Sequence, residues 1–400
     1  MSSAPLFEFI TAIAGEAVSS AFEDAPLVDV HTHVYLPRYA DALRARKDAP
    51  RIASLDIGGR TEERLLILDG EPAAGRPVGP QYWDREEKLK FMRRHNIDVS
   101  IVSLANPWLD FLSPDEAIRL ANDLNVDMDA YCAGSPIADG LPSLRTLYGF
   151  GVLPLAPQVP VSAIVDAVRT LKNLPNVRGV IMGTRGVGAG LDDNTLEPLW
   201  EAIQASGLVV FIHPHYGVDS TAFGPRDNGH VLPLALGFPF ETTIAASRLI
   251  LAGVLDRYPD LKLLLAHSGG ALPALSSRLA SCVAHDPIVS TRLKHDARFY
   301  LGKLYYDAVA YGPDELSLAA AVVGRAHKYS ESGGSYDAEK ASRQLLFGTD
   351  HPFFPPLEET QRWRSVDENL AAIQEAQGLG VTAKDEVRGR NALRLFDLIS

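Results

Sequence analysis

Four short apolar stretches of the sequence end in residues that can bind a metal ion. These residues are His31 with His33, His213, His267 and Asp350. Imidazole nitrogens and a carboxylate oxygen together suit a divalent ion such as zinc or manganese. A single histidine at a strand end is usually structural, but four such ends that meet would leave an open position for water or substrate. The pattern therefore predicts a metal centre, provided that the fold brings the four ends together.

The two histidines at 31 and 33 allow a ligand set to be assigned. Alternate residues of a strand point to the same side, so His31 and His33 can bind one ion. His213 and Asp350 would complete a set of four ligands. His267 could be a further ligand, or it could act as an acid or base on the substrate or on metal-bound water. We favour the second role, because the other four residues already fill the ligand set.

Other histidines have weaker claims. His215 and His351 follow ligand candidates in the chain, and we expect them to point to the other side of their strands as structural or supporting residues. Four further histidines fall on helical patterns or polar loops and are expected at the surface: His95, His285, His295 and His327.

An alternation of short apolar stretches with longer helical patterns supplies the elements that would position these residues. The eight strand candidates are 27–31, 98–105, 147–155, 178–183, 208–213, 261–267, 304–309 and 345–350. This alternation predicts a parallel sheet, and eight units predict a (β/α)₈ TIM barrel, in which active sites lie at the carboxyl ends of the strands. An open doubly wound sheet is the alternative, but no glycine-rich phosphate turn follows the first strand.

Three segments depart from the regular alternation within what we interpret as one domain, residues 1–400. Residues 40–80 are an insertion after strand 1, which we expect to form a lid or small flap over the barrel mouth. Residues 327–343 are polar and rich in glycine and serine, so we expect a flexible surface loop. The first 22 residues lack a basic segment and carry Glu8 and Glu16, so they predict an extra amphipathic helix rather than a signal peptide.

Composition excludes several classes of function. The chain has 400 residues, of which 46% are hydrophobic and 22% charged, as in an ordinary globular protein. The formal net charge of −12 disfavours nucleic-acid binding and means that an anionic substrate needs a local basic pocket. Two cysteines are too few for a disulfide framework, and no apolar run approaches 18 residues. These features favour a cytoplasmic enzyme without a membrane partner.

Longer motifs around these residues resemble one family. They are VDVHTHVYLPRY, ANPW, HPHYG, GHVLPLALGFPFETT, AHSGG and GTDHPFFPP. From about residue 27 to the end, the chain resembles the decarboxylase branch of the amidohydrolase superfamily. That branch includes aminocarboxymuconate semialdehyde and γ-resorcylate decarboxylases, and the resemblance is greatest to the decarboxylases of isoorotate (uracil-5-carboxylate). Two-metal members of the superfamily carry a lysine or carboxylate after strand 4, which is missing here, so the resemblance implies one divalent ion, zinc before manganese.

The resemblance also implies roles for single residues. The metal ligands would be His31, His33, His213 and Asp350, with His267 as an acid or base and Asp350 also as the proton donor. The residues that would contact the substrate are Arg76, Asn106, Phe238, Arg278 and Phe353. In related decarboxylases the arginine at the position of Arg278 reaches the site of a neighbouring subunit, so the resemblance implies a homodimer or a higher homo-oligomer.

The activity implied is the metal-dependent, non-oxidative decarboxylation of a small carboxylate, 5-carboxyuracil, to uracil and CO₂. Such a reaction needs no redox cofactor, and it would belong to pyrimidine salvage. Two alternatives remain open. One is decarboxylation of 2-amino-3-carboxymuconate semialdehyde or of a hydroxybenzoate such as γ-resorcylate. The other is hydrolysis of a lactone or an amide by a metal-activated water.

Overall fold

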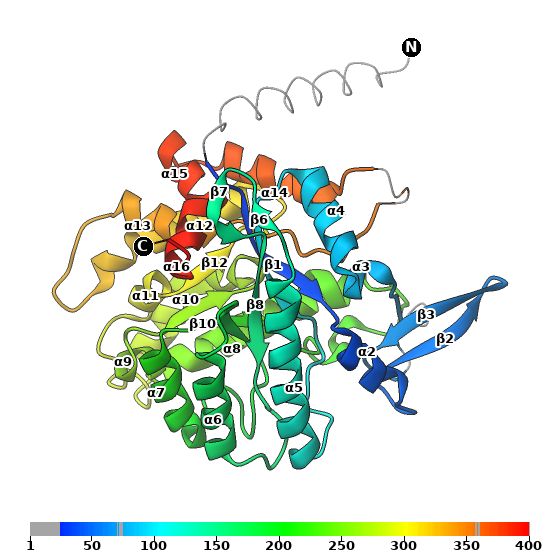
Figure 1. Cartoon of the computed structure of the whole chain (residues 1–400). Helices are drawn as coiled ribbons and strands as arrows, with labels where there is room; N and C mark the ends of the chain where they lie inside the picture. The colour runs from blue at the N-terminus through cyan, green and yellow to red at the C-terminus, as the bar shows by residue number, and fades with distance from the viewer. Residues whose placement is uncertain (1–24, 70, 72–74, 357, 359–360, 400) are drawn as a thin grey trace.

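All eight strands that the apolar stretches predict are present, and they pair in parallel in one sheet (Figure 1). The computed structural model describes residues 25–69, 71, 75–356, 358 and 361–399. The strands pair in chain order: β1 (Val28–Val34), β5 (Val99–Leu104), β8 (Leu147–Val152), β9 (Val177–Gly183), β10 (Val209–His213), β11 (Lys262–Leu265), β12 (Tyr305–Asp307) and β13 (Leu345–Leu346).

The first and last strands meet and close this sheet into a barrel. The amide of Val30 donates to the carbonyl oxygen of Phe347 at 3.0 Å, and the amide of His33 donates to that of His351 at 2.7 Å. Thr32 and His351 also form an isolated parallel bridge. The predicted (β/α)₈ barrel is therefore confirmed over an open doubly wound sheet.

The barrel strands form the centre of the core. Every residue of β1, β5, β8 and β10 is buried. Strands of a parallel sheet are covered on both faces, so they are nearly continuous runs of apolar and β-branched residues rather than alternating ones. Most of the polar residues in β1 and β10 are the histidines singled out above. Because they are buried, these histidines need hydrogen-bond partners or ligands.

Helices surround the barrel in an outer layer, as Figure 1 shows. The larger ones are α4 (Arg85–His95), α5 (Pro114–Ala133), α6 (Val161–Leu171), α7 (Glu197–Ser206), α8 (Phe238–Leu251), α10 (Leu272–His285), α12 (Pro313–Arg325) and α14 (Arg364–Glu375). The shorter ones are α2 (Pro37–Arg44), α3 (Pro80–Trp83), α9 (Val254–Arg257), α11 (Ala297–Tyr300), α13 (Ala338–Arg343), α15 (Val381–Asp385) and α16 (Asn391–Leu395). The local sequence explains where α5 begins: Ser113 and Glu116 form a capping box ahead of Pro114.

One helical segment is more apolar than the sequence analysis expected. Pro233–Leu251 joins a π-helical turn to α8 and, with a mean hydropathy of 1.3, is by length and composition able to cross a membrane. A helix of a barrel's outer layer passes the same test, and 44% of this segment is buried. The charged residues Glu241 and Arg248 interrupt its apolar residues, so the sequence here contains no unbroken apolar run of this length.

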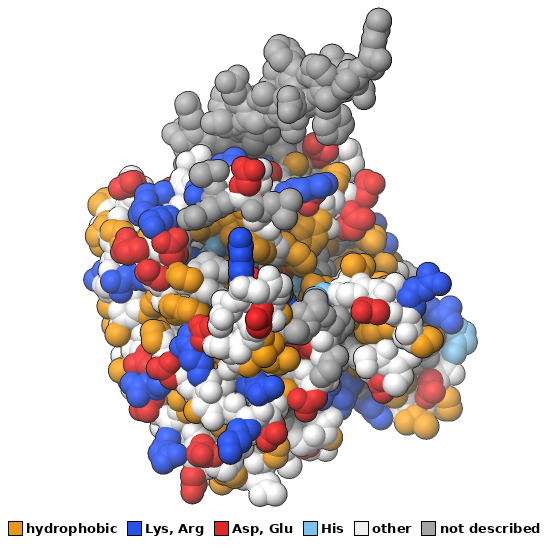
Figure 2. All heavy atoms as spheres, turned by 90° about the vertical axis from the view of Figure 1, so that its right-hand side faces the viewer, with side chains coloured by type: hydrophobic (Ala, Val, Ile, Leu, Met, Phe, Trp, Pro, Cys, Tyr) orange, Lys and Arg blue, Asp and Glu red, His pale blue; other side chains and the backbone are white. Residues whose placement is uncertain are grey.

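The insertion after β1 forms a small antiparallel sheet of β2 (Arg51–Ile57), β3 (Arg60–Leu66) and β4 (Arg76–Pro77). The β2–β3 hairpin turns through Gly58 and Gly59, both with positive φ, as a two-residue hairpin loop requires. Its tip projects away from the barrel (Figure 1), and charged, polar and hydrophobic side chains are mixed over the side of the molecule that carries it (Figure 2). The inner strand β4 brings Arg76 back to the barrel.

The segment 327–343 is only partly a loop. A short 3₁₀ turn covers Ala326–Tyr329, and residues 338–343 form the helix α13. The side chain of Asp337 caps α13 by accepting from the amide of Lys340, which explains why the end of this polar segment is helical. A further hairpin, β6 (Ile137–Ala138) with β7 (Leu141–Arg145), precedes β8. The expected N-terminal helix lies outside the described residues.

Candidate metal centre and cavity

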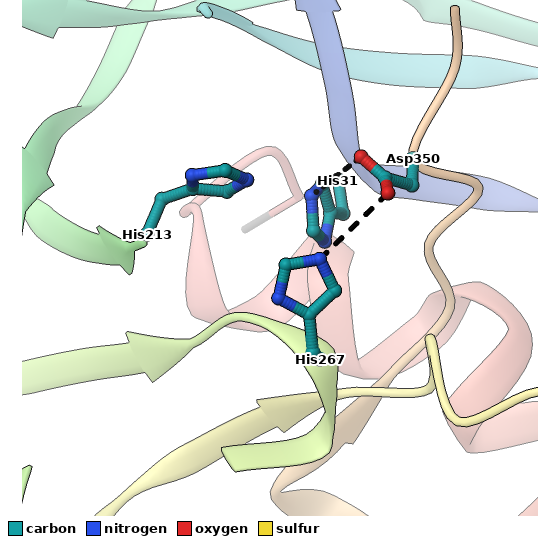
Figure 3. Close-up of side chains that lie close together, drawn as sticks. All are labelled: His31, His213, His267 and Asp350. Carbon is teal, nitrogen blue, oxygen red and sulfur yellow. Dashed lines mark ion pairs between the residues drawn. The ribbon is translucent and has the colours of Figure 1, made fainter. Parts of the chain in front are cut away.

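The five residues that the sequence analysis selected as ligands or acid–base groups lie together at the carboxyl ends of the strands. We call this set the histidine–aspartate cluster: His31, His33, His213, His267 and Asp350. The Nε2 atoms of His31 and His33 are 3.1 Å apart, and Oδ1 of Asp350 lies 3.2 Å from the first and 3.3 Å from the second. Ligand atoms of His31, His213, His267 and Asp350 all lie within 4.8 Å of one another (Figure 3).

Three of the rings are held so that one nitrogen faces the centre of the cluster. Nδ1 of His31 donates to Asp307 at 2.6 Å, and Nδ1 of His213 donates to the carbonyl oxygen of Pro214 at 2.8 Å. Nδ1 of His33 is hydrogen bonded to Oγ of Ser103 at 2.9 Å. An imidazole whose Nδ1 carries the hydrogen has a lone pair on Nε2. Each ring therefore presents an acceptor nitrogen to the same point.

The fit of this cluster to a metal ion rests on an unpaired atom. Nε2 of His213 is buried and has no hydrogen-bond partner. A buried acceptor without a partner is rare in a folded protein, because it loses its hydrogen bond to water. In Figure 3 the His213 ring points at His31 and Asp350. The residues present thus fit a divalent ion with nitrogen and oxygen ligands.

The charges in the cluster suit the same ion. Burial lowers the pKa of His33 to about 4 and holds the pKa of His213 well below its ordinary value. Burial acts in the same direction on His31, but the carboxylates of Asp307 and Asp350 outweigh it and raise its pKa to about 10. Burial would raise the pKa of Asp350, yet the charge of His31 holds it well below its usual range. His33 and His213 are therefore neutral beside the ionised carboxylate of Asp350, which is the form that binds a metal, and His31 would release its second proton when an ion binds.

His267 differs from the other three histidines. Its Nδ1 is buried without a partner, and its Nε2 lies 3.7 Å from Oδ2 of Asp350. Its side chain is 14% exposed, whereas those of His31 and His33 are fully buried. It also follows β11 in a left-handed backbone conformation, with a φ of 54°. His267 is therefore placed between the cluster and the space above it.

That space is a cavity of about 870 Å³, which has His213, His267 and Asp350 in its wall. Four of the five predicted substrate contacts line it: Arg76, Asn106, Phe238 and Phe353. The guanidinium carbon of Arg76 lies 5.3 Å from the ring centre of Phe353 and 5.9 Å from that of Phe238. Among the described residues, Arg76 forms no salt bridge. One amide hydrogen of Asn106 is donated to the carbonyl oxygen of His215.

The fifth predicted contact, Arg278, does not line the cavity of its own chain. It lies on α10 with its side chain exposed. The cavity is lined instead by several polar residues that sequence reasoning missed: Gln81, Tyr82, His230, Tyr311 and Glu315. No spacing or strand-end signal marks them, because they come from α3, from loops and from α12.

Sequence reasoning also missed Asp307, which is fully buried at the end of β12 and contacts the ring of His31. Asp307 does not end its apolar stretch, because the candidate strand 304–309 continues through Ala308 and Val309. The available signal was a charged residue inside an apolar run, since an unpaired carboxylate is rarely fully buried.

A second buried polar set lies on the other side of β1, and we call it the lysine cluster: Lys88, Thr32 and His351. Nζ of Lys88 donates to Oγ1 of Thr32 at 2.7 Å and lies 2.5 Å from Nδ1 of His351. The ring of His351 stacks on Phe91 at 3.7 Å. None of the three lines the cavity. His351 thus points away from Asp350, as strand alternation predicts.

The expected position is found for His215 but not for His95. His215 points away from the cluster, with Nε2 donating to the carbonyl oxygen of Pro107 at 2.7 Å. The surface position expected for His95 is wrong, because this residue is 1% exposed and packs against Phe91. His95 lies on the buried stripe of α4, where it is four residues from Phe91 and three from Met92.

Comparisons with known proteins agree with this geometry. The amidohydrolase family profile matches residues 28–327. The chain is 26% identical over 380 residues to a 2-amino-3-carboxymuconate-6-semialdehyde decarboxylase of Dictyostelium discoideum, covering 93% of this chain and 91% of that one. The crystal structure of apo IDCase from Metarhizium anisopliae is 37% identical, with a TM-score of 0.80, covering 94% and 98% of the two chains. A dihydroxybenzoic acid decarboxylase of Polaromonas sp., solved with bound manganese, shares the fold at 19% identity and a TM-score of 0.65. That match covers 94% of this chain and 98% of the other.

The family assignment follows from these matches together with the barrel and its strand-end residues. The family profile covers three quarters of the chain, and relatives similar over most of their length are decarboxylases. The chain belongs to the amidohydrolase family, and within it to the carboxy-lyases.

Proposed function

We propose that the chain converts 5-carboxyuracil (isoorotate) to uracil and CO₂ without net oxidation. The observation that carries this proposal is the position of the histidine–aspartate cluster at one wall of a cavity that also holds Arg76, Asn106, Phe238 and Phe353. The 37% identity to an isoorotate decarboxylase over nearly the whole chain supports the choice of substrate. The reaction would serve pyrimidine salvage in the cytoplasm.

His31, His33, His213 and Asp350 would hold one divalent ion, for which the donor set favours zinc and also admits manganese. When bound, the ion would polarise the substrate carboxylate and the neighbouring ring oxygen. The three histidines chosen here are those whose Nδ1 atoms are anchored by Asp307, Ser103 and the Pro214 carbonyl. His267 has no such anchor, which supports its assignment as an acid–base group rather than a ligand.

The cavity residues match a flat, anionic pyrimidine. Arg76 can bind the carboxylate, because its guanidinium lies in the cavity wall beside Phe238 and Phe353 and matches a carboxylate with two hydrogen bonds. The free amide hydrogen and the carbonyl oxygen of Asn106 suit the imide edge of uracil. Phe238 and Phe353 flank Arg76, so they can cover the ring faces and exclude water.

The chemical step breaks the bond between carbon 5 and its carboxylate. The electron pair left on carbon 5 takes up a proton, and CO₂ leaves, so no oxidant or reductant is needed. Asp350 lies in the cavity wall beside the ligand rings and would deliver this proton after receiving it from His267, because its own carboxylate is ionised at rest. His267, with its Nε2 at 3.7 Å from Asp350, would return a proton to that carboxylate after each turnover.

A second copy of the chain would complete the site. Arg278 is exposed on α10 and absent from the cavity wall of its own chain. We therefore propose that the chain forms a homodimer or a higher homo-oligomer in which Arg278 reaches the cavity of the neighbouring copy. It would add a second positive charge near the substrate carboxylate and so locally offset the chain's net charge of −12.

The test is to incubate metal-loaded protein with 5-carboxyuracil and to follow uracil by chromatography. Uracil should form, stop forming when a chelator removes the metal, and form again when zinc or manganese is returned. Equal turnover after verified metal removal would contradict metal dependence.

A second substrate class is favoured by the relatives. If no uracil forms, 2-amino-3-carboxymuconate semialdehyde and hydroxybenzoates such as γ-resorcylate are the next substrates, because sequence relatives carry decarboxylase names for these compounds. Release of CO₂ from one of them would keep the reaction class and change the substrate. Hydrolysis of lactones or amides is tested last.

A further inference from the structure

Asp307 accepts hydrogen bonds from two parts of the site at once. Its Oδ2 accepts from Nδ1 of His31 at 2.6 Å and from the amide of His267 at 3.0 Å. Its Oδ1 accepts from the amides of Ser268 at 2.9 Å and Val309 at 3.1 Å. The residue is fully buried and does not line the cavity, so it does not reach the substrate.

The turn that Asp307 supports is strained. His267 and Ser268 are consecutive non-glycine residues with φ values of 54° and 53°. Side chains other than glycine rarely adopt this left-handed region, and such residues persist only where the surrounding structure holds them. Both amides of this turn point at the Asp307 carboxylate. The carboxylate therefore stabilises the backbone that directs the His267 side chain toward Asp350.

Asp307 is also distinct among the ring partners of the three anchored histidines. The partners of His33 and His213 are a hydroxyl and a backbone carbonyl, which carry no net charge. The partner of His31 is a carboxylate. A carboxylate on the far nitrogen fixes the ring orientation and makes the facing nitrogen a stronger donor to a metal ion.

We propose that Asp307 is a positioning residue that sets the metal affinity through His31 and the place of His267 through the 267–268 turn. This inference rests on the proposed function only in taking His31 as a metal ligand. One carboxylate at the end of β12 would thus orient the His31 ring on β1 and also hold the backbone turn that follows β11.

The test is Asp307→Asn, which keeps the shape and removes the charge. Metal affinity is measured without substrate, by competition with a chromogenic chelator. We expect about 10–100-fold weaker metal binding, the usual effect of removing such a partner. With saturating metal, we expect kcat to fall while KM changes little, because His267 is displaced and the substrate contacts are not. Unchanged metal affinity would overturn the proposal.

Asp29→Asn is the matched control. Asp29 is also a fully buried carboxylate near His31, but it accepts from the backbone of His31 and from Thr349 rather than from a ring. This variant should lose thermal stability and keep its metal affinity. An equal loss of affinity in both variants would mean that any buried carboxylate here matters only for folding, which would also overturn the proposal.

Ser268→Gly separates the two tasks. Glycine adopts the left-handed conformation freely, so in the Asp307→Asn background it should restore thermal stability but not metal affinity. If it restored the metal affinity as well, Asp307 would act only through the turn. The same glycine background keeps the comparison possible if Asp307→Asn alone does not fold.

The measurements of metal affinity and thermal stability are independent of the substrate. A chain that binds metal tightly, weakens on Asp307→Asn and yet decarboxylates nothing would support this inference and refute the proposed function. A chain that decarboxylates 5-carboxyuracil with the same metal affinity in both forms would do the reverse.

Discussion

Two buried polar clusters lie on opposite sides of the β1 end, and they differ in what they leave unpaired. The lysine cluster matches its donors and acceptors internally: Lys88 reaches both Thr32 and His351, and Thr32 donates on to the carbonyl oxygen of His351. The histidine–aspartate cluster instead directs several nitrogen lone pairs at one point, and Nε2 of His213 has no partner. Only the histidine–aspartate cluster opens onto the cavity.

This difference separates a histidine that supports the fold from one that can bind a ligand. Both kinds are buried, and both follow the same strands, so neither burial nor sequence position distinguishes them. A closed set of hydrogen bonds stabilises the chain by itself, since each buried group replaces its bond to water. A buried acceptor without a partner beside a cavity, such as Nε2 of His213, is stabilised by a cation from outside. The predictions below test this contrast, in order of expected effect.

The largest effect is expected for Asp350→Asn in the histidine–aspartate cluster. The amide keeps the shape of the side chain but cannot donate the proton or carry the negative charge. We expect kcat to fall by about 10²–10⁴-fold, the usual contribution of a positioned acid. Steady-state kinetics with 5-carboxyuracil measure this, and circular dichroism checks the fold. Near-normal turnover would remove Asp350 from the proton transfer.

A crossed pair of substitutions tests the contrast directly. His213→Gln should weaken metal binding by more than about 100-fold, with little change in stability, because it removes a ligand that no other protein group contacts through Nε2. His351→Gln should leave metal affinity unchanged and cost about 1–3 kcal/mol of the free energy of unfolding, because it disturbs a buried hydrogen bond to Lys88.

Metal titration and urea unfolding of both variants provide the readout. If both lost metal affinity equally, the two clusters would not be separate functional units.

Arg278→Ala tests whether the cavity beside the histidine–aspartate cluster is completed by another copy of the chain. We expect KM for the carboxylate to rise by about 10–100-fold with little change in kcat, since a charge-assisted hydrogen bond is lost. Mixing this variant with an Asp350→Asn chain should restore some activity if the arginine acts across a subunit boundary. An unchanged KM would exclude Arg278 from the site.

The smallest effect on the metal site is expected for Lys88→Met, which instead changes how stability depends on pH. Burial lowers the pKa of Lys88 from 10.5 in the unfolded chain to about 7. Between these values the unfolded state binds more protons than the folded state, so the free energy of unfolding rises with pH.

Below pH 7 the lysine is charged in both states and its cost is greatest. Relative to Lys88→Met, the unsubstituted chain should therefore gain about 1 kcal/mol per pH unit from pH 7 towards 10. Urea unfolding at several pH values measures the difference. Parallel curves for the two proteins would show that Lys88 does not titrate in this range.

The periodicity of the strands accounts for most of what could be predicted. His31 and His33 share a face because their spacing is two, and the structure places their Nε2 atoms 3.1 Å apart. All eight strands follow from apolar runs. In contrast, Asp307 and Lys88 were missed because each depends on contacts with elements far along the chain: Asp307 meets His31, and Lys88 meets Thr32 and His351.

The insertion after β1 shows a second feature that the sequence could not predict, the direction in which the β2–β3 hairpin points. Its composition marks a departure from the barrel pattern, but which way a hairpin points depends on packing at its base. The tip of the hairpin extends away from the barrel, while Arg76 on β4 lies between two phenylalanines in the cavity wall (Figure 1). Arg76 was selected by resemblance alone, since an arginine in a polar segment is usually solvated.

The sequence by itself determined which strand ends carry ligand-type residues and which of these share a face, because side-chain alternation is a local property of a strand. The tertiary structure decided that the ends meet. Closure of the barrel pairs Thr32 with His351, 319 positions away, and thereby brings Asp350 to His31 and His33. It also decided which polar groups are satisfied and which face a cavity, because that depends on neighbours from several strands and not on any one of them.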